Sequence, residues 1–352
     1  MHIQINAELL SKDLKNVAYI VSKFKQESEL ASVKLQTIDN SLVVTISNDH
    51  DKAVITVPCT IQESGECFVV AHKFIGAIQS FIGDVELVCT DKHLTLEQQY
   101  IKIKLPLVAH NPLCDVFNRV TFDNTYKICG SILNNMVSIV SPFADVDEKV
   151  IISGINMLIS GSSFQVRACH NAAMAVSTHH NKDTSNGNAN ITVKTSTMQA
   201  IGKLFADEDI EIKTADSLVC FVGKSCVLYT RTIRGVYPPI EKLIEDESLC
   251  KVNMSRQLLE TCLRRILVVK TLSKRLNVLI SDNIMTVNYD QVLTDKLYID
   301  HTGQETQFAV NYEYLLTVLR VFNGAQIAFA VTPTRKLQFF DDQNIIIISP
   351  LC

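Results

Sequence analysis

The chain has 352 residues, of which 47% are hydrophobic and 20% are charged, and its formal net charge at pH 7 is -4. This length and apolar content predict a globular protein of two or three domains, and the acidic balance argues against indiscriminate binding of nucleic acid over the whole surface. No apolar run reaches membrane-spanning length, and the N-terminal stretch MHIQINAELL lacks the pattern of a signal peptide, so we expect a cytoplasmic protein.

The hydrophobic pattern predicts six helices, over residues 9–25, 71–82, 124–141, 195–206, 254–276 and 311–324. Apolar residues alternate in the stretches between them, as in SLVVTIS (41–47) and SFQVRA (163–168). A period of two is typical of half-buried strands. The pattern therefore predicts six units, each with one helix and several strands.

Three of these units resemble one another in sequence: VVAHKFIGAIQSF (69–81), VKTSTMQAIGKLF (193–205) and VNYEYLLTVLRVF (310–322). When the strands after these helices are aligned, Val85 corresponds to Ile210 and Ile327, with spacings of 125 and 117 residues. Each spacing is close to one third of the chain and is the size of a domain. We therefore predict three similar domains, over residues 1–119, 120–247 and 248–352.

The predicted helices differ in charge from the rest of the chain. Together they contain 14 Lys and Arg against 3 Asp and Glu, a net charge of +11, which leaves -15 on the remaining residues. Helices gathered on one side of such a protein would present a basic surface to a polyanion, for which a nucleic-acid duplex is the natural candidate. The alternative is that these charges only keep the outer faces of amphipathic helices in water.

Enzyme signatures are absent from the sequence, which has no Gly-rich phosphate loop, no G-x-S-x-G and no H-E-x-x-H. Cys169 and His170 could be a nucleophile and its base, but neighbours on a strand point to opposite faces. The DVDEK stretch (145–149) and the pair His179 and His180 are interpreted as solvated loop residues. The eleven cysteines include no C-x-x-C pair, and we expect them to be reduced and mostly buried. We expect no metal and no cofactor.

Four segments, in this order along the chain, resemble the β sliding clamp, the processivity subunit of bacterial DNA polymerase III: VVAHKFIGAIQSF (69–81), IISGINMLISGSSFQVRA (151–168), RGVYPPIEKLI (234–244) and IIIISPLC (345–352). The resemblance implies an α+β fold of three repeated clamp domains, each with two helices backed by antiparallel sheets. It also implies a homodimeric ring, with no catalytic site, that encircles duplex DNA and tethers the replicative polymerase and other replication or repair proteins.

Two alternatives to a sliding clamp stay open at this point. One is a clamp-like scaffold for protein interactions that does not encircle DNA, and the weaker one is an enzyme whose active site is not contiguous in sequence. The sequence also departs from the family pattern, because CHNAAMA (169–175) stands where the family has a Thr-Asp-x-His-Arg run. The departure falls in the family's protein-binding cleft, so we expect fewer polar contacts there and a preference for apolar anchors.

The resemblance implies three sets of functional residues. The residues expected to line the DNA are Lys12, Lys15, Lys73, Lys203, Arg256, Arg264 and Arg320. The residues expected in a cleft for short peptides of the polymerase and the clamp loader are Ile152, Cys169, Asn171, Met174, Pro238, Lys242, Leu243, Ile347, Ser349, Pro350 and Leu351. The residues expected at the dimer interface are Ile101, Ile103, Leu267 and Val268. For Ile152, Met174 and Ile347 the alternative is a role in the core of the strands alone.

Overall fold

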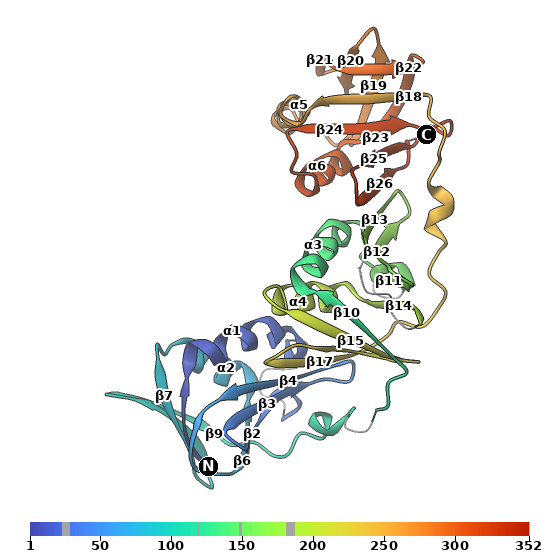
Figure 1. Cartoon of the computed structure of the whole chain (residues 1–352). Helices are drawn as coiled ribbons and strands as arrows, with labels where there is room; N and C mark the ends of the chain where they lie inside the picture. Colours follow the sequence, from blue (N-terminus) through green and yellow to red (C-terminus); the bar gives the residue numbers. More distant parts are fainter. Residues whose placement is uncertain (23–28, 118–119, 148–149, 181–186, 352) are drawn as a thin grey trace. The chain divides into compact units, whose positions relative to one another are not determined.

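The structure is a computed structural model that describes residues 1–22, 29–117, 120–147, 150–180 and 187–351. Parts of several predicted features lie outside the described residues: the end of the first predicted helix, residue 119 at the first domain boundary, and two residues of the DVDEK stretch. His179 and His180, predicted to lie in a loop, instead end the strand Ala173–His180. Within the described residues the chain forms six α-helices and 26 strands, in the order shown in Figure 1.

The chain divides into two compact units. Unit 1 contains the described residues of Met1–Asn135, Thr184–Gly187 and Ser196–Ile233, and unit 2 contains those of Met136–Asp183, Asn188–Thr195 and Arg234–Cys352. The three predicted domain ranges remain a prediction.

Unit 1 contains two antiparallel sheets. The first has five strands in the order β5 (Thr60–Glu63), β1 (His2–Asn6), β7 (Asp84–Cys89), β8 (His93–Gln98) and β9 (Ile101–Pro106). The second has eight, in the order β10 (Asn124–Cys129), β15 (Asp209–Ala215), β16 (Leu218–Val222), β17 (Cys226–Arg231), β4 (Asp51–Pro58), β3 (Ser41–Ser47), β2 (Ser32–Ile38) and β6 (Glu66–Val70). The pairing of β17 with β4 joins strands from the first and second predicted domains, with Leu228 opposite Ala53.

Unit 2 also contains two antiparallel sheets. The larger has nine strands in the order β14 (Asn188–Lys194), β11 (Gly154–Ser160), β12 (Ser163–His170), β13 (Ala173–His180), β26 (Asn344–Ile348), β25 (Leu337–Phe340), β24 (Gln326–Val331), β18 (Cys250–Ser255) and β22 (Asp300–Gly303). The smaller has four, β21 (Leu293–Tyr298), β20 (Ile284–Tyr289), β19 (Arg275–Ser281) and β23 (Thr306–Asn311). Here β13 pairs with β26, which joins the second and third predicted domains.

All six predicted helices are present, but they are shorter than predicted: α1 (Ala7–Val17), α2 (Ala71–Gln79), α3 (Gly130–Val140), α4 (Thr195–Leu204), α5 (Arg256–Val268) and α6 (Tyr312–Val321). Two begin at an asparagine cap, because the side chains of Asn6 and Asn311 accept hydrogen bonds from the first turn of α1 and α6. The third window was too long because TYKIC alternates, with Tyr126 and Ile128 buried on one face of β10.

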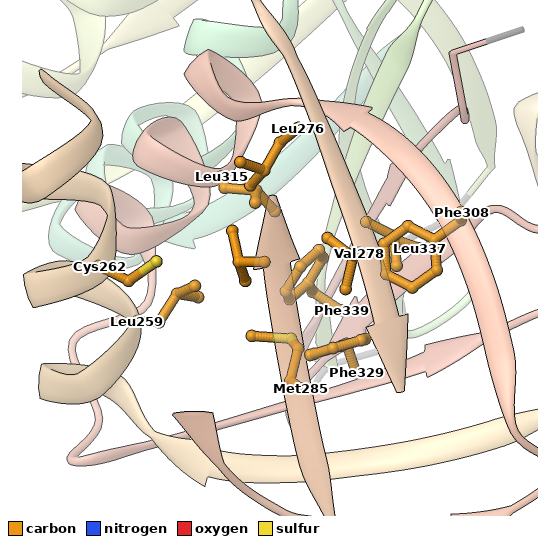
Figure 2. Close-up of a pocket in the computed structure, with 11 residues that line it drawn as sticks. Leu259, Cys262, Leu276, Val278, Met285, Phe308, Leu315, Phe329, Leu337 and Phe339 are labelled. Carbon is orange, nitrogen blue, oxygen red and sulfur yellow. The ribbon is translucent and has the colours of Figure 1, made fainter. Parts of the chain in front are cut away.

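The core of unit 2 lies between its two sheets and under α5 and α6. Figure 2 shows side chains from these elements around a small cavity of about 20 Å³. Its lining is entirely apolar, from Leu259 and Cys262 on α5 to Phe329 and Phe339 on the larger sheet. A void of this size without polar partners does not hold water stably, so it is a packing defect and not a ligand site.

The cysteine prediction is confirmed for the described residues. All ten described cysteines are free, and seven of them are buried. No helix among the described residues is long and apolar enough to cross a membrane.

Candidate functional site

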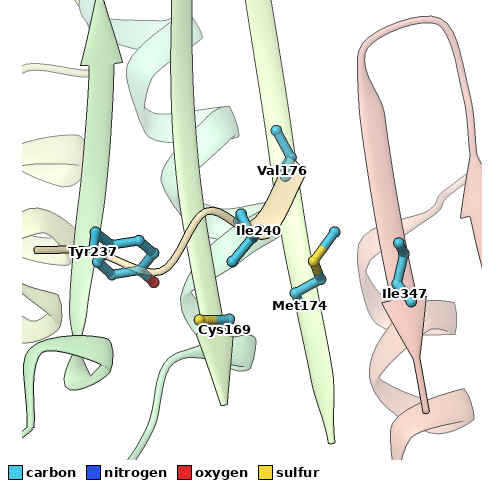
Figure 3. Packing of buried hydrophobic residues seen from close by; sticks show 6 residues of the cluster. All are labelled: Cys169, Met174, Val176, Tyr237, Ile240 and Ile347. Atoms are coloured by element: carbon cyan, nitrogen blue, oxygen red, sulfur yellow. The ribbon is translucent and has the colours of Figure 1, made fainter. Parts of the chain in front are cut away.

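An apolar cluster in unit 2 brings together several of the predicted cleft residues. It consists of Cys169, Met174, Val176, Tyr237, Ile240 and Ile347, each at most 6% exposed (Figure 3). Cys169 lies opposite Met174 across β12 and β13, and Met174 lies opposite Ile347 across β13 and β26. Residues directly opposite each other on neighbouring strands have side chains on the same face of a sheet. The three strands therefore form an apolar floor.

The segment from Arg234 to Ile244 runs over this floor. It contains a one-turn 3-10 helix, η6 (Ile240–Leu243), whose Ile240 is 1% exposed. Pro238 is half-buried and Lys242 is exposed, while Leu243 keeps 43% of its surface in solvent. The half-buried side chains of Ile151, Ile152, Ile244 and Ile345 pack against the cluster. The segment thus forms an apolar rim above the strands.

The turn between β12 and β13 contacts the end of the chain. Asn171 is exposed in this turn, and the backbone N–H of Ser349 donates to the carbonyl of Ala172 over 2.8 Å. The N–H of Leu351 then donates to the carbonyl of Ala309 on β23, also over 2.8 Å. Ser349, Pro350 and Leu351, all half-buried, are therefore held beside the turn.

The structure brings the predicted cleft residues into one region. Ile152, Cys169, Met174 and Ile347 lie in or against the cluster. Met174 and Ile347 are only 2% and 3% exposed, as the alternative of a core role requires. Any ligand would first contact the rim residues, of which Leu243 is the most exposed apolar one among those predicted.

Arg167 is the residue of this region that the sequence prediction missed. It lies on β12 and is only 3% exposed. Its Nε and one terminal nitrogen donate to Oδ1 of Asn156 over 3.0 and 2.5 Å, and the other terminal nitrogen pairs with the Glu241 carboxylate. Its guanidinium lies 5.8 Å from the centre of the Tyr237 ring. The available signal was a charged residue between the apolar residues of a strand followed by a glutamate in the rim segment.

The electrostatic environment does not support a nucleophile in this region. Burial raises the pKa of the Cys169 thiol and the pKa of the Tyr237 phenol, so both stay protonated near neutral pH. Burial also lowers the pKa of His170, whose Nδ1 accepts a hydrogen bond from the N–H of Ala172 over 3.1 Å. The His170 ring packs against the Tyr314 ring at a tilt of 36°, with a centroid distance of 5.2 Å. The imidazole is thus engaged away from the thiol.

The predicted DNA-lining residues fall into two groups. Lys15, Lys73, Lys203 and Arg320 are exposed and have no ion-pair partner among the described residues. The other three are engaged: Lys12 with Asp207 at 3.2 Å, Arg264 with Glu260 at 2.6 Å, and Arg256 with Glu260 at 3.0 Å. Arg256 also donates to two backbone carbonyls at the end of α6, so it links α5 to α6.

The predicted helix charge of +11 is wrong. Within the observed bounds the six helices carry eight Lys and Arg against four Asp and Glu, a net charge of +4, and α3 has no charged residue. Of this difference of seven charges, four come from basic residues beyond the observed helix ends, two from Lys23 and Lys25, which lie outside the described residues, and one from Glu8, which α1 includes and the window left out. Lys127 lies on β10, Arg275 on β19, and Lys270 and Lys274 follow the end of α5.

The predicted interface residues lie at exposed positions. In unit 1, β9 is the outer strand of the five-stranded sheet, with Ile101 51% exposed and Ile103 half-buried. In unit 2, Leu267 and Val268 end α5 and are 44% and 85% exposed. An open sheet edge and exposed apolar side chains are the features that a subunit contact requires.

Comparison with known proteins places this geometry among the sliding clamps. No protein-family model matches the chain. The curated β sliding clamp of Staphylococcus epidermidis is 20% identical over 268 residues, which span 72% of this chain and 71% of that protein. The DNA polymerase III β subunit of Pseudomonas aeruginosa bound to griselimycin matches with a TM-score of 0.92 at 17% identity, over 100% of this chain and 99% of that one.

Two further solved structures give the same result. The β subunit of Streptococcus pyogenes DNA polymerase has a TM-score of 0.89 at 19% identity, covering 100% of both chains. The Thermotoga maritima DNA polymerase III β subunit has a TM-score of 0.90 at 15% identity, over 100% of this chain and 99% of that one. The resemblance drawn from the sequence is confirmed at the level of the fold, which is that of the β sliding clamps.

Proposed function

We propose that this chain, which has the fold of the β sliding clamps, is itself a DNA sliding clamp that encircles duplex DNA and holds the replicative polymerase on it. The observation that carries the proposal is the match of the fold over the full length of solved clamps, at TM-scores of 0.89 to 0.92. Processivity then comes from topology, because a closed ring cannot leave a circular duplex without opening.

Partner proteins bind, in this proposal, by a short extended peptide at the apolar cleft of unit 2. The polymerase and the clamp loader are the proposed partners. The buried floor and the exposed Leu243 support apolar anchors in such a peptide. Met174 supports adaptable recognition, because an unbranched thioether side chain can fill pockets of different shape. The proposed cleft residues are the eleven predicted from the sequence.

Contacts to DNA are proposed to be loose and independent of base sequence. Lys15, Lys73, Lys203 and Arg320 are the best candidates because they are exposed and have no ion-pair partner among the described residues. Side chains of this kind bind phosphate and carry no sequence information. We propose a smaller contribution from Lys12 and Arg264, which are paired, and a structural role for Arg256.

Ring closure is proposed to occur by head-to-tail association of two chains. The open edge of β9 with Ile101, and the exposed Leu267 and Val268, support one joint of this kind. Two such joints related by a two-fold axis would leave neither edge open.

A non-catalytic role is part of the proposal. No group of three or more His, Cys, Asp or Glu that could hold a metal ion is found among the residues that the structure describes. Cys169 is buried and protonated, which supports a cleft that binds a partner and does not supply a nucleophile.

The second candidate, a clamp-like scaffold that does not encircle DNA, is favoured by one observation. The six helices of the described residues carry a net charge of only +4, and α3 is uncharged. Two measurements separate the candidates. Light scattering at micromolar concentration should give twice the chain mass of 39.3 kDa, and the protein should stay bound to a circular plasmid but run off after the plasmid is linearised. A monomer, or equal retention on both DNA forms, would support the scaffold.

A further inference from the structure

The buried side chain of Arg167 links the larger sheet of unit 2 to the segment from Arg234 to Ile244. Asn156, a fully buried residue of β11, orients the Arg167 side chain. The Oδ1 of Asn156 accepts hydrogen bonds from two nitrogens of the Arg167 guanidinium. The remaining terminal nitrogen is paired with Glu241 of η6, whose side chain is 45% exposed. An arginine keeps its charge even when buried, so its position depends on finding an anionic partner.

Within residues 234–244 the other hydrogen bonds are short-range backbone bonds, and directly after this segment Glu245 pairs with Lys336 at 2.9 Å and accepts from the Thr334 hydroxyl. The 3-10 helix of the segment has a single turn, closed by backbone bonds such as that from Lys242 N–H to the carbonyl of Pro239 over 3.2 Å. One turn of helix is not stable alone, because fixing its dihedral angles costs more entropy than one hydrogen bond returns. Apolar packing of Ile240 fixes the depth of the turn, whereas its rotation is constrained more strongly by directional contacts, because packing is non-directional.

We propose that Arg167 and Glu241 are positioning residues of the cleft. Their ion pair fixes the rotation of η6 on β12 and thereby places Lys242 and Leu243 at the rim for a partner peptide. Arg167 itself is too deeply buried to contact that peptide. This inference rests on the proposed function of the cleft. It implies that peptide binding there depends on the ion pair between Arg167 and Glu241.

The test is a titration of a peptide of the Gln-Leu-x-Leu-Phe type against the full chain and two matched variants. Glu241→Gln removes one negative charge from the rim segment and leaves Arg167 unpaired. Glu247→Gln removes the same charge from an exposed position a few residues further along. We expect Glu247→Gln to bind like the parent and Glu241→Gln to bind at least about tenfold more weakly, because breaking a desolvated charge pair affects dissociation strongly.

A double variant separates positioning from stability. Replacing both partners, as in Arg167→Met with Glu241→Gln, removes the unpaired buried charge and should restore much of the thermal stability lost in Glu241→Gln. If the pair positions η6, the double variant still binds the peptide weakly. If the pair only stabilises the fold, affinity returns together with stability, and the inference is overturned.

A local reporter makes the result independent of the peptide. The chain has no tryptophan, so Val236→Trp, at a position 90% exposed, introduces a single tryptophan within the segment and before η6. We expect its fluorescence anisotropy to fall when Glu241→Gln is added and to stay unchanged with Glu247→Gln. A parent chain that does not bind the peptide contradicts the cleft function alone. Unchanged anisotropy and unchanged affinity in Glu241→Gln contradict the positioning role.

Discussion

Met174 and Ile347 in the cleft of unit 2 are buried side by side on neighbouring strands, whereas Lys15 and Lys203 on the helices are exposed and have no ion-pair partner among the described residues. The proposed cleft lies within one chain, where the residues of the three strands and of the segment from Arg234 to Ile244 pack together. The basic side chains are proposed to contact the phosphates of DNA.

The two proposed functional surfaces therefore differ in kind. A surface made by packing tolerates few substitutions, because each change disturbs neighbours that are already in contact. A surface made by scattered charges tolerates single changes and responds to their sum. Substitutions in the two regions should therefore differ in size and in additivity.

The largest expected effect is in the cleft. Met174→Lys with Leu243→Lys should weaken binding of the Gln-Leu-x-Leu-Phe peptide by at least about 100-fold, because a charge forced into an apolar cluster costs several kcal/mol and each 1.4 kcal/mol is tenfold in affinity. Isothermal titration calorimetry measures the change.

Controls for the cleft prediction are available in the same unit. Leu258→Lys places the same charge on the exposed face of α5 and should leave peptide binding unchanged. Leu243→Lys alone changes only a half-exposed rim residue, so it should weaken binding without unfolding the strands. Parent-like affinity in the double variant would show that the peptide binds elsewhere.

The next effect is a difference in stability between variants of two arginines, Arg256 and Arg320, which the sequence predicted to have the same role. Arg256→Ala should lower the free energy of unfolding by about 2 kcal/mol, because three charge-assisted hydrogen bonds to α6 and Glu260 are lost. Arg320→Ala, at the exposed end of α6, should change it by less than about 0.5 kcal/mol. Urea unfolding followed by circular dichroism compares the two, and equal losses would argue against the structural role of Arg256.

The sequence predicted features that leave a local pattern and missed features that depend on residues far apart in the chain. The alternation and the three-fold repeat predicted the helices and the strands of the cleft, because apolar residues at fixed periods are what the core selects. The pairings of β17 with β4 and of β13 with β26 were not predictable, because strand partners far apart in sequence leave no local signal. The role of Arg167 was missed for the same reason, since Glu241 lies 74 positions further along.

The helix charge was overestimated for a different physical reason. Propensity and amphipathic pattern locate a helix but do not fix its ends, which depend on caps and on where strand alternation begins. Lys127 was counted as helical although its neighbours alternate in the strand β10. A predicted basic surface is therefore sensitive to errors of a few residues, whereas a predicted apolar floor is not.

A smaller effect is expected from the exposed basic residues, and it should be graded. Changing Lys15, Lys73, Lys203 and Arg320 together to Glu should shorten the lifetime of the protein on circular DNA at least about tenfold, because each lost phosphate contact lowers the salt slope of log affinity by about 0.9. Each single change should have a minor effect. The dimer should persist in light scattering, and full retention by the fourfold variant would contradict a pore lined by these side chains.

The smallest expected effect is a pH dependence at the edge of the cleft. Burial lowers the pKa of His170 below its ordinary value, although nearby Asp145 acts in the opposite direction. The unfolded chain therefore binds a proton at His170 at a higher pH than the folded chain does. The stability that comes from a neutral His170 is present above the unfolded pKa, about 6.5, and decreases as pH falls from there toward the folded pKa.

His170→Gln removes this titration while keeping an acceptor near the N–H of Ala172. We expect the parent to lose thermal stability between pH 7 and pH 5 by more than His170→Gln does, as measured by differential scanning calorimetry at both pH values. His301, which is half-buried at the far edge of the same sheet on β22, provides the matched control as His301→Gln. Because the β12–β13 turn that holds His170 also contacts Ser349, peptide affinity should weaken over the same pH interval in the parent and stay level in His170→Gln. An identical pH profile in both chains would mean that folding does not lower the pKa of His170, which would contradict this prediction.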